Sequence, residues 1–454
     1  MTRTMKNSGV EWIGQIPASW KSGRIKDILN VLTDYTANGS FADLAKNVEY
    51  LDYESYARLV RLTDLRSFLQ NYDAVYVDKN SYDYLSKSKL FGGEILVANV
   101  GAYAGLFCEM PKLNINATLG PNMFLITTNQ KMLQHFLFYL GNSDIIYKQL
   151  SAKMASAAQP KLNKQDIKTT YLLIPPLPEQ QAIADYLDDK CAQIDNITAT
   201  INEQIEVLKQ YKKSVITEAV TKGLDPNVPM KGSGVEWIGQ ISEKWNIERF
   251  KYNFTFSKGL QITKADLREE GCPVISYGQI HSKINNGVSV NLKLIRFVDG
   301  SYQEEKSAIT QYGDIIWADT SEDYDGIGNS IFIDSNKNIF AGYHTIITRP
   351  LLDKITKYFA YLFQTDIWRL QLRKQATGIK VFSITQKMLK NCSILIPPLC
   401  EQQAIADYLD DKCAQIDAVI ADKQTQLETL AAYKKSLIYE YVTGKKSVPG
   451  FEEA

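Results

Sequence analysis

The sequence predicts an α/β (α+β) protein, in which two mixed α/β domains are joined by two long antiparallel coiled-coil helices in a pseudo-two-fold internal repeat. Three observations predict this architecture: a duplicated stretch of sequence, strict heptads within that stretch, and mixed strand-like and helix-like segments between its copies. The chain has 454 residues, 45% of them hydrophobic and 22% charged, which is typical of globular domains.

The duplication is visible directly in the sequence. Residues 8–16 read SGVEWIGQI, and residues 233–241 repeat them 225 positions later. Residues 174–195 read IPPLPEQQAIADYLDDKCAQID, and residues 396–417 repeat them 222 positions later with Cys400 in place of Pro178. A period of this length is far too long for a solenoid, so the chain contains two domain-sized copies.

The sequence between the duplicated blocks differs strongly in the two copies. Residues 21–171 and 246–393 share only faint marks, such as Gly93-Glu94-Ile95-Leu96 against Gly313-Asp314-Ile315-Ile316 and an apolar stretch at 59–65 against 274–280. A constant frame with two different inserts suggests two recognition modules with different targets. We therefore expect a first domain at 1–173 with the N-terminal repeated segment, a central coiled-coil helix at 174–224, a second domain at 225–395, and a C-terminal coiled-coil helix at 396–446.

Each frame helix is predicted from an uninterrupted heptad pattern. No Gly or Pro occurs at 179–222, and Pro178 suits the first helical position, where its missing N–H costs nothing. The seam positions are Leu187, Ile194, Ile201, Leu208 and Val215 in the first copy, and Leu409, Ile416, Leu430 and Leu437 in the second; Ile183, Ile197, Tyr211, Ile405, Val419 and Tyr433 form a neighbouring stripe. Two nearly identical faces pair around a two-fold axis, which means antiparallel packing. The alternative is that each helix packs only on its own domain.

The inserts combine both kinds of secondary structure. We expect strands at Glu94–Val100 and Asp314–Ala318, which are short apolar runs after glycine-containing turns. Helices are expected at Lys131–Leu150 and Asp353–Leu372, and one side of the first would carry Phe136, Leu137, Leu140 and Tyr147.

The sequence lacks the usual marks of catalysis. We find no phosphate-binding loop and no Asn-Pro-Pro-Tyr motif, and the three histidines, His135, His281 and His344, share no metal-ligand spacing. The six cysteines form no CxxC pair, so we expect reduced thiols and neither zinc nor disulfides. No apolar run approaches the roughly 20 residues of a membrane helix, and the N-terminus has no apolar signal core, so we expect a cytoplasmic protein.

The inserts contain residue types that contact nucleic acids. Arg, Lys, Asn and Gln read base edges or bind phosphates, and Tyr can line such a surface. The first insert offers Arg58, Arg61, Arg66, Asn99, Tyr103, Lys153, Gln159, Lys161 and Lys164; the second offers Lys258, Gln261, Lys264, Tyr277, Gln279, Arg373, Lys374, Gln375 and Lys380. For any single residue the alternative is a solvated surface charge. The net charge of zero is a point against a dedicated DNA binder.

The SGVEWIGQIP opening, the Gly-Glu/Asp-Ile strand and the IPPLPEQQAIADYLD frame resemble the specificity subunits of Type I restriction–modification systems, from Asn7 to Lys445. The resemblance implies two target recognition domains, each reading half of a bipartite double-stranded DNA site. It also implies that the paired helices act as a spacer and dock two methylation subunits, which restriction subunits then join. S-adenosylmethionine, ATP and Mg²⁺ would bind those partners, and this chain would be a non-catalytic DNA-recognition subunit without cofactors.

Two other functions stay open at this point. The chain could be a coiled-coil protein-interaction scaffold that does not read DNA, or a specificity subunit that serves methylation alone. The dependence of DNA binding on salt separates the scaffold from a DNA reader, because phosphate contacts weaken steeply as salt rises.

Overall fold

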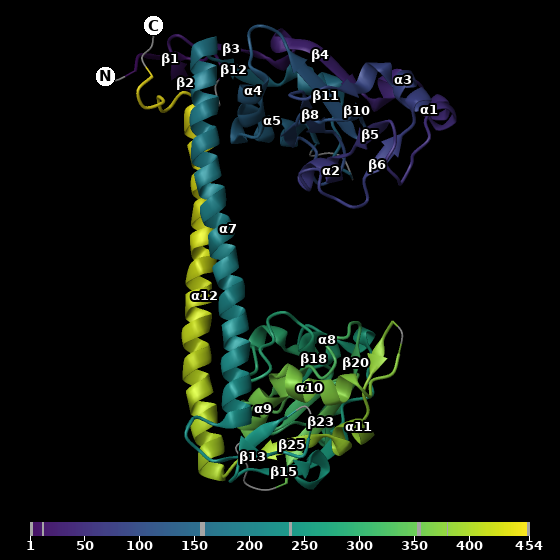
Figure 1. The fold of residues 1–454 in the computed structure, drawn as a ribbon, viewed down its shortest axis with the longest axis vertical. Coiled ribbons are helices and arrows are strands. Elements are labelled where there is room, and N and C mark those ends of the chain that lie inside the picture. The colour runs from purple at the N-terminus through teal and green to yellow at the C-terminus, as the bar shows by residue number, and fades with distance from the viewer. Residues whose placement is uncertain are drawn as a thin grey trace. The chain divides into compact units, whose positions relative to one another are not determined.

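The computed structural model describes residues 3–10, 13–154, 159–235, 238–351, 356–378 and 380–451 (Figure 1). The chain forms two compact units, residues 1–201 with 425–454 and residues 202–424. Each unit therefore contains one α/β domain and parts of both long helices, and each is described by itself below. None of the described helices combines the length and apolarity needed to cross a membrane.

The first domain is built on two four-stranded sheets. The central sheet is antiparallel in the order β4-β11-β8-β9, and the second has the order β6-β5-β10-β7, in which β5 and β10 run parallel. The strands are β1 (Met5–Asn7), β2 (Gln15–Pro17), β3 (Lys21–Arg24), β4 (Leu29–Asp34), β5 (Ala57–Val60), β6 (Val75–Val77), β7 (Lys89–Leu90), β8 (Ile95–Ala98), β9 (Phe107–Glu109), β10 (Asn116–Leu119), β11 (Met123–Thr128) and β12 (Tyr171–Ile174). The helices are α1 (Phe41–Asn47), α2 (Leu62–Arg66), α3 (Lys79–Tyr84), α4 (Gln134–Gly141), α5 (Asp144–Met154) and α6 (Lys164–Thr169).

The second domain repeats this plan. Its central sheet has the order β16-β23-β19-β21, and β17 pairs with β18 and, in parallel, with β22. The strands are β13 (Met230–Gly232), β14 (Gln240–Ser242), β15 (Asn246–Arg249), β16 (Phe254–Lys258), β17 (Cys272–Ile275), β18 (Arg296–Val298), β19 (Ile315–Ala318), β20 (Thr320–Ser321), β21 (Ser330–Phe332), β22 (Phe340–Ala341), β23 (Thr345–Pro350), β24 (Phe382–Ser383) and β25 (Ser393–Ile396). The helices are α8 (Tyr277–Ile280), α9 (Thr356–Gln364), α10 (Asp366–Arg373) and α11 (Gln386–Asn391).

The two inserts have the same backbone features at matching positions, in spite of their different sequences. Asn122 and His344 both have positive φ, 67° and 54°, and their carbonyls accept from the N–H groups of Asn99 and Asp319, each at 3.1 Å. The short Gly-Glu/Asp-Ile similarity between the inserts forms the turn into β8 in one domain and into β19 in the other. Gly93 and Gly313 each have φ 91° in this turn. The strands predicted at Glu94–Val100 and Asp314–Ala318 are confirmed as β8 and β19, each of which follows such a turn. The copies therefore diverged in their side chains on a conserved framework.

The predicted helices at 131–150 and 353–372 are wrong in extent, because each region forms two short helices. The chain turns after α4 at Asn142, whose side chain bonds the backbone of Phe107 at 3.1 and 2.8 Å. In the second domain Thr365 caps a new helix by accepting from the Trp368 N–H at 3.3 Å. Phe136, Leu137 and Leu140 are buried as expected, but Tyr147 is exposed because it lies on α5, which has its own direction. The expected start at Asp353 lies outside the described residues.

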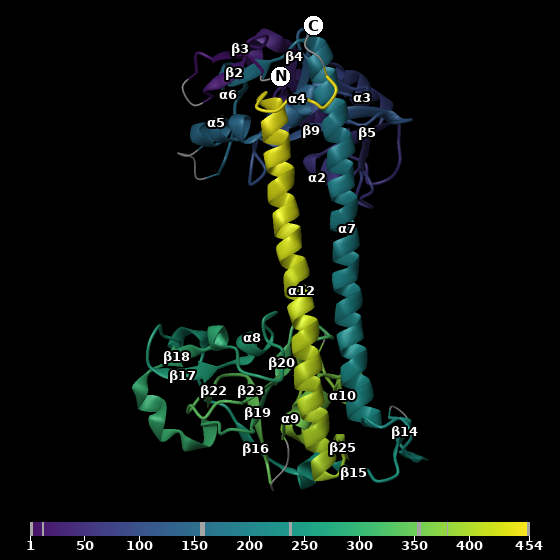
Figure 2. The same ribbon diagram turned by 90° about the vertical axis from the view of Figure 1, so that its left-hand side faces the viewer.

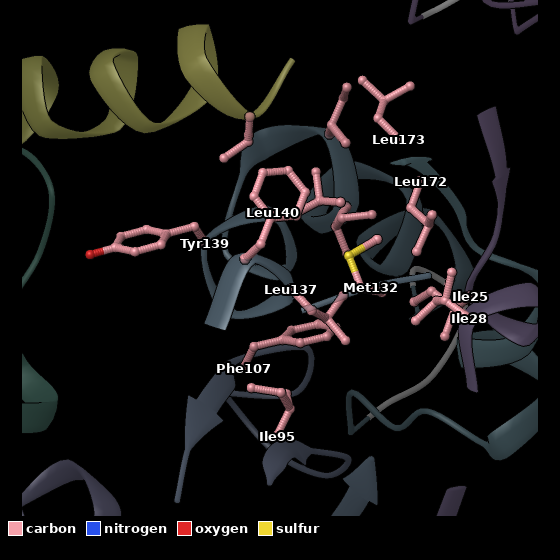
Figure 3. Close-up of a cluster of buried hydrophobic side chains, with 14 of the residues drawn as sticks. Ile25, Ile28, Ile95, Phe107, Met132, Leu137, Tyr139, Leu140, Leu172 and Leu173 are labelled. Carbon is pink, nitrogen blue, oxygen red and sulfur yellow. The ribbon is translucent and has the colours of Figure 1, made fainter. Parts of the chain in front are cut away.

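Each domain has its own core. Figure 3 shows that of the first unit, where Ile95 and Phe107 from the central sheet meet Leu137 and Leu140 from α4. The core of the second unit is aromatic, and the Phe363 ring centroid lies 4.4 Å from that of Trp368 and 4.9 Å from that of Trp317. Edge and tilted ring contacts of this kind add to area burial.

The frame helices are α7 (Leu177–Lys222) and α12 (Leu399–Val442). In the first unit the start of α7 meets the end of α12, where Lys434 Nζ lies 2.6 Å from Asp195 Oδ1. In the second unit the order is reversed, and Lys212 Nζ lies 2.6 Å from Asp417 Oδ2. These two ion pairs occupy matching positions of the repeat, and within each unit the two helix segments run antiparallel, as predicted (Figure 2).

Most of the predicted seam is buried. Leu187, Ile194, Ile201, Leu409, Ile416 and Leu437 are buried, and Leu208, Val215 and Leu430 are half-buried. The neighbouring stripe is partly wrong: Ile183 and Ile405 are buried, but Ile197, Tyr211, Val419 and Tyr433 are exposed. An α-helix drifts by about 20° per heptad against a strict seven-residue repeat. The seam therefore passes to Ile205, which is 5% exposed and lies four residues after Ile201.

Both helices begin in the same way. Helix α7 starts at Leu177, so Pro178 is its second residue rather than its first, and the Pro176 carbonyl accepts from the N–H of Glu179 at 3.0 Å. The Pro398 carbonyl does the same for Glu401 at 2.9 Å. Cys400 therefore occupies the place of Pro178 without shifting the helix start.

Two side-chain hydrogen bonds per domain fix each domain on its helix. The indole N–H of Trp20 donates to Glu179 at 2.7 Å, and that of Trp245 donates to Glu401 at 2.9 Å. Likewise, the Tyr139 hydroxyl donates to Asp188 at 2.6 Å, and the Tyr361 hydroxyl donates to Asp410 at 2.7 Å. The alternative that each helix packs only on its own domain is therefore wrong, because each helix contacts both its own domain and the other helix.

The helix seam should contribute far more stability than the interhelical ion pairs. We expect Leu187→Ala and Leu409→Ala each to lower the free energy of unfolding by roughly 2–5 kcal/mol, as large-to-small changes in a core do. The control, Lys212→Ala, should cost less than about 1 kcal/mol because the pair with Asp417 is half in water. Urea unfolding of the three variants measures this, and equal losses would contradict the assignment of the seam.

His135 should make the first unit sensitive to alkaline pH. Hydrogen bonds to Glu109 and Asp188 raise the pKa of His135 to about 9, so its stabilising charge is complete below the unfolded value of about 6.5 and is lost as pH rises through 9. At the matching position Lys357 Nζ lies 2.7 Å from Asp410. We expect His135→Lys to move the loss of unfolding free energy to higher pH and His135→Gln to abolish it. Urea unfolding between pH 6 and pH 10 checks this, and parallel profiles for all three proteins would refute it.

Candidate nucleic-acid interface

In the first domain the loop that follows strand β8 gathers several of the predicted residues. This loop, residues 99–105, runs beside residues 159–162, since the Gly101 N–H donates to the Pro160 carbonyl at 2.9 Å and the Leu162 N–H donates to the Asn99 carbonyl at 2.8 Å. The structure thereby brings Asn99, Tyr103, Gln159 and Lys161 to one end of the central sheet. The side chains of Gln159, Lys161 and Tyr103 are exposed.

Helix α2 adds a cation to this cluster. The guanidinium carbon of Arg66 lies 3.9 Å from the centroid of the Tyr103 ring, and both side chains are exposed. A guanidinium on an aromatic face is held in place while its N–H groups stay free to bind an anion. The Arg66–Tyr103 pair therefore combines a flat apolar surface with a positive charge, which suits a base and a phosphate.

The second domain has the matching loop at residues 319–328. It pairs with the end of the insert in the same way, because the Ile384 N–H donates to the Asp319 carbonyl at 2.8 Å. Its exposed tyrosine is Tyr324, with the guanidinium carbon of Arg373 5.7 Å from the ring centroid. Sequence reasoning missed Tyr324. Its position after the Gly-Asp-Ile-Ile strand was the available signal.

A cleft of about 540 Å³ lies beside this loop. Lys258 and Gln261, both predicted, line it together with Asp319, His344 and Lys387. Burial raises the pKa of Asp319, although the His344 ring lies 3.2 Å from its carboxylate. Tyr277 packs edge-on against His344, with ring centroids 5.5 Å apart. His344 and Lys387 were not anticipated from the sequence.

Several predicted residues form hydrogen bonds or ion pairs within their own domain. Arg58 is 8% exposed and donates to the Leu69 carbonyl at 3.0 Å. Arg61 pairs with Asp64 at 2.8 Å, and the Lys153 ammonium donates to the hydroxyls of Thr169 and Thr170 at 2.9 and 3.0 Å. Burial lowers the pKa of Lys153.

The predicted residues of the second domain divide in a similar way. Gln279 accepts from the Ser276 N–H at 3.0 Å, and Arg373 pairs with Asp366 at 2.9 Å. Lys258, Gln261, Lys264, Lys374, Gln375 and Lys380 are exposed. The basic run at 369–380 is not one continuous surface, because Arg369 is 9% exposed and donates to Asn329 at 2.7 Å. Burial lowers the pKa of Arg369 to about 10.

The described part of the chain offers no metal site. No group of three or more His, Cys, Asp or Glu side chains is arranged there to hold a metal ion. All six cysteines are free: Cys191, Cys272, Cys392 and Cys413 are buried, Cys108 is half-buried and Cys400 is exposed.

The family model described as Type I restriction modification DNA specificity domain matches this chain twice, at residues 17–207 and 242–429. The putative type I restriction enzyme MjaX specificity subunit of Methanocaldococcus jannaschii is 25% identical, with 95% of each chain covered. The type I restriction enzyme EcoKI specificity subunit of Escherichia coli is 20% identical and covers 95% of this chain and 90% of its own.

Two solved structures share the fold. One, from a study of complex assembly and conformational transition of the type I R-M system, has a TM-score of 0.69 at 18% identity and covers 95% of this chain and 99% of its own. The other is the HsdS subunit from Thermoanaerobacter tengcongensis, with a TM-score of 0.52 at 17% identity over 95% of this chain and 98% of its own.

Substitution of a buried arginine should lower the free energy of unfolding more than substitution of an exposed lysine. We expect Arg58→Met to lower the free energy of unfolding by about 1–3 kcal/mol, because the buried partners of the guanidinium lose their donor. Lys161→Met, on the surface of the same domain, should change it by less than about 0.5 kcal/mol. Urea unfolding of both variants decides the matter; a stable Arg58→Met protein would show that the arginine does not hold its loop.

Proposed function

This chain belongs to the Type I restriction–modification DNA specificity family, and we propose that it binds a bipartite double-stranded DNA site, one half through each α/β domain. The supporting observation is that one backbone framework carries two different sets of polar side chains. At the matching loop positions the first domain has half-buried Asn99 and exposed Asn122, and the second has half-buried Asp319 and exposed His344. Amides pair with adenine edges and carboxylates accept from cytosine, so the two domains suit different half-sites.

The paired helices serve as the spacer between the two readers in this proposal. A fixed separation of readers makes the unread gap between half-sites a geometric property of the protein. The matched ion pairs, Asp195 with Lys434 and Lys212 with Asp417, support a single helix register. Linking two weak readers also raises the overall affinity without any new contact.

The exposed stripe of the helices is the surface we assign to the methylation subunits. The first unit exposes Ile197 and Tyr433, and the second exposes the matching Val419 and Tyr211. The repeated surface supports two copies of one partner, in line with the self-complementary symmetry of the repeat. Restriction subunits would join this assembly in the cytoplasm, and S-adenosylmethionine, ATP and Mg²⁺ would bind the partners while this chain catalyses nothing.

The net charge of zero suggests that partners supply part of the phosphate-binding surface. We therefore expect the complex to bind cognate DNA more tightly than the isolated chain at equal salt. The scaffold alternative is not favoured by the family, and a steep fall of affinity with salt would exclude it. A specificity subunit that serves methylation alone fits the same observations.

A methylome tests the proposal. The chain and its methylation subunit are co-expressed in an unmethylated host, association is confirmed by pull-down, and modified adenines are mapped by sequencing. We expect a two-part motif with a fixed unread gap. Replacing residues 21–171 with another insert should change one half only, and the matched replacement of 246–393 should change the other. Association without any methylated motif would refute DNA reading.

A further inference from the structure

Two aromatic side chains protrude from the first domain on the segment Ser67–Asp73, which joins α2 to β6. Phe68 is 86% exposed and Tyr72 is fully exposed. Leu69, by contrast, packs against a buried cluster that includes Val60 and Leu119. Exposed apolar side chains that lie together, unlike single ones, mark a candidate surface for a partner.

Buried polar groups hold this segment from beneath. The Arg58 guanidinium donates to the Leu69 carbonyl at 3.0 Å and to Asn71 Oδ1 at 2.9 Å. The Asn71 amide in turn donates at 2.7 Å to Asp64, whose carboxylate is completely buried. The position of the two rings is therefore fixed by the fold, even though the rings themselves have little packing.

The backbone of the segment is strained. Phe68 and Leu69 are consecutive residues with φ of 51° and 62°, a left-handed conformation that side chains with a Cβ disfavour. Glycine would adopt it without strain. The left-handed backbone at Phe68 is not offset by burial of its ring, which makes this ring a candidate for contact with a partner.

The surroundings of the two rings fit duplex DNA. Arg66 directly precedes the segment and lies on the Tyr103 ring, so the segment continues the aromatic and basic surface of the 99–105 loop. The nearby carboxylates of Asp64 and Asp73 are both paired with Arg61, at 2.8 and 3.2 Å. The protruding face therefore combines free cationic N–H groups with apolar rings and little negative charge.

The second domain lacks this feature. After α8 the matching segment, residues 281–291, contains no Phe, Tyr or Trp. Its left-handed residue is Gly287, with φ 79°. The strained aromatic segment is thus a property of one domain and not of the shared framework.

We propose that residues 67–73 form an aromatic wedge, in which Phe68 and Tyr72 insert between base pairs of the half-site read by the first domain. Apolar wedges of this kind unstack a base step and bend the duplex, and Arg66 binds the adjoining phosphate. The second domain reads its half-site without unstacking it. This inference rests on the proposed function, because it assumes that the chain reads DNA.

The test uses the complex of this chain with its methylation subunits and duplexes that carry 2-aminopurine in one half-site or the other. The probe is placed away from the adenines that are methylated, because a methyltransferase flips its target base out of the stack and would itself raise the emission there. Wild type should raise the 2-aminopurine emission in the first half-site only. F68A/Y72A should bind about 10-fold more weakly or worse and lose the emission rise, with an unchanged salt slope because no phosphate contact is removed. Phe41→Ala, which removes a ring on α1 that is 77% exposed, is the matched control and should behave as wild type.

A second variant separates a role of the Phe68 ring in DNA binding from a role in the stability of the fold. Phe68→Gly removes the ring and relieves the backbone, so its melting temperature should equal or exceed that of wild type while DNA binding falls as in F68A/Y72A. A lower melting temperature would show that the ring is structural and would overturn the wedge.

Three further results would also overturn it, and they are distinguishable from one another. Wild-type affinity and emission in F68A/Y72A would refute the wedge and leave bipartite reading intact. Failure of that variant to assemble with the methylation subunits would make the segment a protein-docking surface. Absence of sequence-specific binding by the wild-type complex would refute the proposed function itself.

Discussion

Two helices of 46 and 44 residues, each with an apolar seam, must cover those seams or remain unstable in water. Because α7 and α12 come from two copies of one sequence, each offers the other a nearly identical face. Antiparallel pairing then lets contacts between repeated residues form twice, as the Asp195–Lys434 and Lys212–Asp417 pairs show. The rest of the structure depends on this constraint, since both α/β domains are attached to the paired helices.

The attachment uses carboxylates rather than apolar contact alone. Glu179 and Glu401 accept from buried indoles, and Asp188 and Asp410 accept from tyrosine hydroxyls. A hydrogen bond to a charged acceptor fixes direction as well as distance. Each domain is thereby oriented on its helix segment, and the loops after β8 and β19 are in turn fixed on the central sheets.

The sequence predicted the frame well because the frame is repeated and periodic. The identical stretches reveal the duplication, and the heptads predict the buried seam. The prediction fails at Ile197 and Tyr211, which are exposed because an α-helix drifts against a strict seven-residue repeat. It predicted much less of the interface, because a guanidinium suits a phosphate and a backbone carbonyl equally well. Only tertiary burial separates Arg58, which holds a loop from within, from Arg66, which lies on the surface.

The sequence also showed little sign that the two inserts have matching backbone features, because different residues can adopt the same backbone conformation. Asn122 and His344 perform the same backbone task in the same left-handed conformation, yet their side chains are chemically different. A framework defined by main-chain hydrogen bonds places few demands on residue identity. Phe68 and Tyr72 were missed because an exposed aromatic ring on a loop has no periodic signature.

The first and last strands of each insert pair with each other. In the first domain Lys21 of β3 stands opposite Ile174 of β12, and in the second Asn246 of β15 stands opposite Ile396 of β25. The chain thus leaves and re-enters the frame at neighbouring points, next to blocks that are nearly the same in both copies. Crossing-over between genes within those blocks would deliver a whole insert with both of its closing strands. New specificities can then arise by inheritance of complete cassettes, without gradual rebuilding of a reading surface.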